Sequence, residues 1–172
     1  MSRSEPEQFQ LKRLTQSAIP AAIERAEQYR LLNEPELAES ICLDVLEIDP
    51  DNQPVLVMLL LAVTDQFVES VAGKLDQAKK LLHRINDEYQ RAYYHGLIHE
   101  REARAFLHRA SPGAGYAAHQ GLTEAMRFYE DAEKIRPAES DEALLRWNTC
   151  VRTIQSGHLE PAPADDTPLM LE

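Results

Sequence analysis

Apolar residues recur at helical spacing along most of the chain, and two such segments meet between Ala22 and Pro54. In the first segment Ala26, Tyr29 and Leu32 recur at i, i+3 and i+6, which places them on one face of a helix. Asn33 is suited to the turn that follows. The apolar face of the second segment consists of Ala38, Ile41, Cys42, Val45, Leu46 and Ile48. Two apolar faces joined by a short polar turn predict a helical hairpin.

The same spacing predicts five further helices, over residues 54–67, 74–85, 87–109, 121–137 and 140–154. Residues 70–73 are expected to form a lengthened turn, and Ser140 is expected to cap the last helix. The cluster of Pro and Gly at 111–115 predicts the end of the long helix, followed by a loop through residues 116–120.

The first hairpin resembles the tetratricopeptide repeat, a helix pair with small residues at fixed intervals and a closing proline. The resemblance rests on Ala26-x2-Tyr29, on Ala38-x3-Cys42 and on Pro50. It recurs later, because Ala125, Tyr129, Ala132 and Pro137 stand at the same intervals as Ala38, Cys42, Val45 and Pro50. The chain departs from the family where Ala22 and Arg25 replace Trp and Leu and where Cys42 replaces an aromatic residue.

The resemblance implies an all-α fold, a TPR-like right-handed superhelix of about three helix-turn-helix pairs with a C-terminal capping helix. Residues 19–156 would form this domain. Residues 1–18 are expected to be a leading helix or a partly disordered arm. Residues 157–172 are rich in Pro and acidic residues without apolar periodicity, which predicts a disordered tail.

The resemblance also implies a concave groove, lined by the first helix of each pair, that binds a peptide or a helix. The groove residues inferred from it are Ile23, Glu27, Arg30, Val57, Leu61, Thr64, Tyr93, Leu97, Glu100, Glu142 and Arg146. None of them is Lys or Asn, so the family's carboxylate-binding clamp is not expected. The alternative is that Val57, Leu61, Tyr93 and Leu97 belong to the core, because groove and core share one periodicity.

The charge of the chain restricts its partners. Lys and Arg number 18 and Asp and Glu 29, for a net charge of -11, which opposes nonspecific binding to nucleic acid. An apolar or basic protein partner is expected, and the pattern is compatible with a homo-oligomer. Cys42 and Cys150 lie among apolar residues, as buried free thiols do in a reducing compartment. The longest apolar run, residues 55–63, is far shorter than the roughly 20 residues of a membrane span, so a cytoplasmic protein is expected.

Few residues suggest catalysis. His95 and His99 recur at i and i+4 and could share a helix face with Glu102, which is a spacing found at zinc sites. The sequence contains no HExxH, GxSxG or CxxC motif and no phosphate-binding loop. We therefore expect a non-enzymatic adaptor or scaffold without a cofactor. The alternatives are a small secretion-type chaperone and a metal-dependent enzyme built around His95 and His99.

Overall fold

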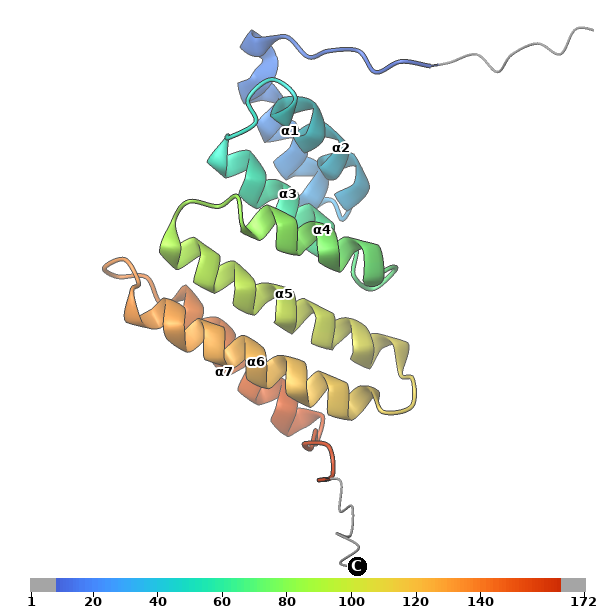
Figure 1. The fold of residues 1–172 in the computed structure, drawn as a ribbon, viewed down its shortest axis with the longest axis vertical. Helices are drawn as coiled ribbons and strands as arrows, with labels where there is room; N and C mark the ends of the chain where they lie inside the picture. The colour runs from blue at the N-terminus through green and yellow to red at the C-terminus, as the bar shows by residue number, and fades with distance from the viewer. Residues whose placement is uncertain (1–8, 165–172) are drawn as a thin grey trace, which may run out of the picture.

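The computed structural model describes residues 9–164, and within them all regular structure is helical (Figure 1). Successive helices pack mostly against each other as antiparallel pairs. None of the helices in this range is both long and apolar enough to cross a membrane. After a short 3-10 turn at Gln16–Ala18, the elements are α1 (Ile19–Leu31), α2 (Pro35–Leu46), α3 (Gln53–Asp65), α4 (Ala72–Leu82), α5 (Glu88–Arg109), α6 (Ala114–Lys134) and α7 (Glu142–Ser156).

The hairpin predicted at the start of the chain is confirmed as α1 and α2. Asn33 makes the turn with a φ of 61°, in the left-handed region that asparagine tolerates better than most residues. Pro35 opens α2, where its missing N–H costs no helical hydrogen bond. Ala26 and Ala38 are buried, and their small side chains let the two helices approach closely.

The third and fourth predicted helices form with shifted ends. Asn52 caps α3, because its side-chain oxygen accepts a hydrogen bond from the Val55 N–H at 3.1 Å. Helix α4 begins at Ala72, so the last two residues of the turn expected at 70–73 belong to the helix. The connection between α3 and α4 runs over residues 66–71.

A carboxylate on α2 holds that connection in place. Glu39 accepts hydrogen bonds from Gln66 and Lys74, each at 2.6 Å, and from Gln77 at 3.0 Å. Burial alone would raise the pKa of Glu39, but these hydrogen bonds and the Lys74 charge outweigh it and lower the pKa. The ionised carboxylate therefore ties α2 to α3 and α4.

The pairing of α5 with α6 differs from the expected arrangement. Residues 116–120, predicted as a loop, belong to α6, and this prediction is wrong. The turn runs over residues 110–113, with Ala110 at a φ of 49° and Gly113 at a φ of 78°, so the helix can begin at Ala114. Burial of one row of side chains along α6 stabilises the helix despite its glycine-rich start. The row consists of Ala114, Ala118, Leu122, Ala125, Tyr129 and Ala132.

Gly96 sits where α5 and α6 are closest. A Cβ at Gly96 would lie 2.7 Å from Cε1 of Tyr129 and 3.1 Å from the carbonyl oxygen of Ala125. Because Gly96 has no side chain, the buried ring of Tyr129 can occupy the space beside it.

Of the two alternatives for residues 1–18, the described part does not favour the leading helix, and one predicted helix cap needs correction. Residues 9–15 form no helix, because Phe9 and Leu11 find no apolar surface and only Leu14 packs on the core. The sequence also offers Ser4, three residues before Glu7, as the cap of a leading helix, but this position lies outside the described residues. Ser140 does not cap α7, which begins after Asp141; instead its hydroxyl lies 3.4 Å from that of Tyr89.

The buried side chains form two hydrophobic clusters. The N-terminal cluster draws on α1 to α4 and includes Ile98 and Ala105 of α5, whereas the C-terminal cluster draws on α5 to α7. Each contains one of the two free cysteines, Cys42 and Cys150. Burial raises the pKa of both thiols to about 12, so they remain protonated and behave as small apolar groups.

The segment after α7 is irregular up to residue 164, but one residue of it packs. Leu159 lies against the C-terminal cluster, and its N–H donates to the carbonyl of Ile154 at 3.0 Å. Truncation after Gln155 is therefore expected to lower the free energy of unfolding by about 1 kcal/mol, roughly half of the gain for a fully buried leucine. Urea titration checks this, and truncation after Glu160, which retains Leu159, is the matched control with no expected loss.

Candidate functional site

The candidate site is a surface shared by the odd-numbered helices. Helices α1 and α3 contact each other, as do α3 and α5, and side-chain contacts extend the series from α5 to α7. We call this surface the odd-helix face and define it by Arg30, Leu61, Asp65, Tyr93, Tyr94, Arg101 and Arg146. All seven side chains are half-buried.

One carboxylate links the first three odd-numbered helices. Asp65 accepts Arg30 Nε on Oδ2 at 2.6 Å and Arg101 Nη1 on Oδ1 at 2.7 Å. Arg101 also donates to the carbonyl oxygen of Leu61 at 3.0 Å and to the hydroxyl of Thr64. Burial lowers the pKa of Arg101, and the neighbouring Asp65 charge opposes that shift. An arginine side chain stays protonated even when burial lowers its pKa. The carboxylate of Asp65 therefore lies between two positive charges, those of Arg30 and Arg101.

A second, fully buried carboxylate links α5 to α6 and α7. Glu100 accepts the Tyr129 hydroxyl at 2.7 Å, Arg104 Nε at 3.1 Å and Arg146 Nη1 at 3.3 Å. Burial would lower the pKa of Arg146, but its interaction with the Tyr93 hydroxyl and the Glu100 charge outweigh burial and raise it. The pKa of Tyr129 is raised, first by burial and then by the Glu100 charge. The cluster therefore joins the side chain of Glu100 to two guanidinium groups and the phenol of Tyr129.

The residues expected to line a groove divide into three groups by exposure. Glu27 and Glu142 are exposed, while Ile23, Arg30, Val57, Leu61, Tyr93 and Arg146 are half-buried. Thr64, Leu97 and Glu100 are buried at 2%, 1% and 0% exposure. These three side chains therefore lie beneath the surface rather than on it.

Four apolar residues, Val57, Leu61, Tyr93 and Leu97, could belong either to the groove or to the core, and they differ in burial in the structure. Leu97 is core, and Val57 and Tyr93 pack against the N-terminal and C-terminal clusters respectively while remaining half-exposed. Leu61 is half-buried and belongs to neither cluster. Of these four side chains, Leu61 is therefore the half-buried one that packs on neither cluster.

Sequence reasoning missed Asp65, Tyr94 and Arg101 as members of the face. A signal was present, because Asp65 and Arg101 each follow an expected face residue, Leu61 and Leu97, by one i+4 step. The charge of Arg101, taken alone, would place this residue on the solvated side of its helix. The i+4 relation places each charged residue on the same row of its helix, one turn further along.

His95 and His99 are stacked between helices. The ring centroid of Phe128 lies 3.7 Å from that of His95 and 5.5 Å from that of His99. Within residues 9–164 no group of three or more His, Cys, Asp or Glu side chains is arranged to hold a metal ion. Burial lowers the pKa of both imidazoles, that of His95 to about 4, and half-buried Glu102 has a pKa raised by burial.

The lowered histidine pKa predicts a pH dependence of stability. A native pKa of about 4 against 6.5 for the exposed group means that the unfolded chain binds the proton more readily. The stabilisation is therefore complete above pH 6.5 and is lost as the pH falls toward 4. Between pH 7 and pH 5 we expect a loss of about 1 kcal/mol after discounting for solvent screening. Urea titrations at both values should show a smaller loss for His95→Gln but an unchanged one for His108→Gln, whose side chain is exposed.

Comparison of the chain with protein-family models, with curated proteins and with solved structures gave no significant match. The structure alone defines the class of the protein. It is all-α, with seven helices in the described range packed mostly in sequential antiparallel pairs.

Proposed function

We propose that the protein is a non-catalytic adaptor or scaffold that binds a peptide or helix of another protein on the odd-helix face, in the manner of a tetratricopeptide repeat domain. The observation that carries the proposal is the continuity of this face. Its side chains come from α1, α3, α5 and α7, and two carboxylates fix their relative positions. Such preorganisation reduces the entropy lost when a partner binds.

The side chains of the face supply the contacts that a peptide needs. Leu61 offers apolar area, and Tyr93 and Tyr94 offer amphipathic rings that lose little conformational freedom on binding. A guanidinium group has five N–H donors. Arg30 uses Nε for Asp65, so its terminal nitrogens can donate to carbonyl groups of a bound peptide. An apolar anchor beside backbone-directed donors suits an extended or helical segment.

The net negative charge of the protein favours a basic partner. The chain carries a net charge of -11, so a basic segment approaches with electrostatic attraction. The exposed Glu27 and Glu142 add negative charge at the first and last helices of the face. The proposed ligand is thus an amphipathic peptide with an apolar residue for Leu61 and basic residues toward its ends.

The experiment is selection of a displayed random-peptide library on the purified protein. We expect enrichment of peptides with an apolar residue flanked by basic ones, and a loss of affinity of about tenfold or more for Leu61→Asp, because the apolar contact is lost. Leu43→Asp on α2 is the control, since Leu43 is exposed at 47% but lies on an even-numbered helix. Circular dichroism should show both variants folded. Equal losses in the two variants, or no enrichment, would contradict the proposal.

A further inference from the structure

The exposed apolar side chains of the protein are concentrated at its N-terminal end. Among residues 9–164, ten large hydrophobic side chains are exposed, and six of them lie before α3: Phe9, Leu11, Leu31, Leu32, Leu37 and Leu43. Phe9 and Leu11 are 91% and 94% exposed, which leaves their apolar area almost wholly in water. Exposed apolar residues gathered in one region mark an interaction surface.

These residues form two patches of opposite charge. The arm patch consists of Phe9, Leu11, Lys12 and Arg13, and the turn patch of Leu31, Leu32, Glu34, Glu36 and Leu37. Every residue of both patches is exposed. None of the four charged side chains takes part in an ion pair within residues 9–164. One patch is apolar and basic, the other apolar and acidic, so the two are complementary.

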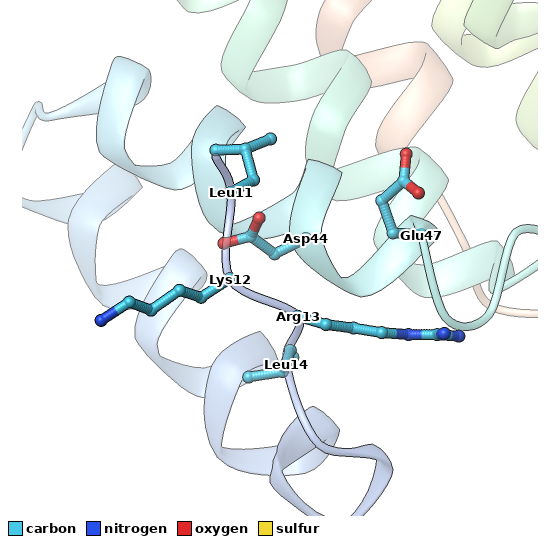
Figure 2. A pocket seen from close by; sticks show the side chains of 6 residues that line it. All are labelled: Leu11, Lys12, Arg13, Leu14, Asp44 and Glu47. Atoms are coloured by element: carbon cyan, nitrogen blue, oxygen red, sulfur yellow. The ribbon is translucent and has the colours of Figure 1, made fainter. Parts of the chain in front are cut away.

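The two patches lie at opposite ends of the first hairpin. Leu14 packs on the N-terminal cluster, and the arm borders a cavity of about 270 Å³ beside Asp44 and Glu47 at the end of α2 (Figure 2). The side chains of Lys12 and Arg13 extend from the arm in opposite directions (Figure 2). The turn patch begins at the other end of α1, whose 13 residues span about 20 Å.

The arm cannot cover the turn patch of its own chain. Three residues of extended backbone reach about 10 Å, so Leu11 stays near the start of α1 while Leu14 remains packed. Two hairpins placed side by side and antiparallel bring each arm patch to the turn patch of the other chain. A twofold axis then repeats the same contact twice.

We propose that the protein forms a homodimer in which the arm patch of each copy binds the turn patch of the other. Phe9 and Leu11 pack on Leu31, Leu32 and Leu37 of the second copy. Lys12 and Arg13 extend to opposite sides of the arm, so each meets a different carboxylate, Glu34 or Glu36, at its own margin of the contact. The interface involves α1, α2 and the arm but not Leu61, so it is independent of the proposed peptide-binding function.

Light scattering coupled to gel filtration of the full chain, over a concentration series, tests the dimer. We expect twice the chain mass of 19.5 kDa for the wild type. Phe9→Ser with Leu11→Ser, and separately Leu31→Ser with Leu32→Ser, should each weaken dimerisation by about tenfold or more, because each pair removes apolar area from the contact. Leu145→Ser is the control, because Leu145 is 60% exposed on α7 and should not affect the mass.

Reversing the charges of each patch distinguishes the specific pairing of the two patches from nonspecific hydrophobic association. The variant Lys12→Glu with Arg13→Glu and the variant Glu34→Lys with Glu36→Lys should each be monomeric alone, because like charges then face each other. Mixed together they should form a heterodimer, in which both contacts again join opposite charges. A monomeric wild type, a dimer unaffected by the leucine variants, or a mixture that stays monomeric would each overturn the proposal. Leu61→Asp should remain dimeric, so loss of peptide binding and loss of the dimer are distinguishable.

Discussion

Glu100→Ala is expected to lower the free energy of unfolding by about 2 to 3 kcal/mol, less than for a fully buried ion pair because the partners Arg104 and Arg146 are 46% and 38% exposed. The side chain of Glu100 is 0% exposed, and within residues 9–164 Arg146 forms no ion pair with another carboxylate. The alanine also leaves the hydroxyl of Tyr129, fully buried, without its acceptor. Urea titration of the wild type and the variant measures the loss.

Two variants sharpen this result. Glu100→Gln keeps an acceptor for Tyr129 but removes the charge, so its loss should be intermediate. Glu27→Ala, at an exposed position of the odd-helix face, should change stability by no more than about 0.5 kcal/mol. If Glu100→Ala were as mild as Glu27→Ala, the buried cluster would have no stabilising role in joining α5 to α6 and α7.

Gly96→Ala is expected to destabilise the protein by about 1 to 3 kcal/mol through overpacking, although alanine is the better helix former. The added Cβ would lie 2.7 and 2.8 Å from two ring carbons of Tyr129 and 3.1 Å from the backbone oxygen of Ala125. The ring is fully buried and its hydroxyl is held by Glu100, so it cannot move aside freely. Helices α5 and α6 must therefore separate.

The matched control is the same substitution at Gly73, a helical glycine whose surroundings leave room for a side chain. A Cβ at Gly73, in the first turn of α4, meets no atom within 4 Å. Gly73→Ala should thus be neutral or stabilising by up to about 1 kcal/mol. Thermal unfolding of both variants gives the comparison, and a Gly96→Ala protein as stable as Gly73→Ala would contradict the close packing of α5 on α6.

Much of the fold could be predicted because its signals are local. Asn33 and Pro35 mark the first turn, and an apolar row at helical spacing identifies each helix without knowledge of its neighbour. The start of α6 could not be predicted in this way. Its first residues are small and flanked by glycine, so the local sequence favours a loop, and the helix depends on packing along α5.

The candidate site was predictable only as a set of positions, not as an arrangement. The resemblance to the tetratricopeptide repeat placed Arg30, Leu61 and Arg146 on corresponding faces of their helices. It could not show that Asp65 would take two arginines, because Arg30 and Arg101 are distant from it in sequence and meet it only in the folded chain. Nor could it separate buried Glu100 from the exposed carboxylates, since a charged residue is ordinarily placed in solvent.

Helix α5 belongs to both hydrophobic clusters, which has a consequence for cooperativity. Its Ile98 and Ala105 complete the N-terminal cluster, while Ala103 and Tyr93 pack in the C-terminal one. If α1 to α4 opened alone, the side of α5 that they cover would meet water, so the partly open form carries an added cost. Amide exchange should accordingly be slowest in the middle of α5, where protection is shared by two foldons.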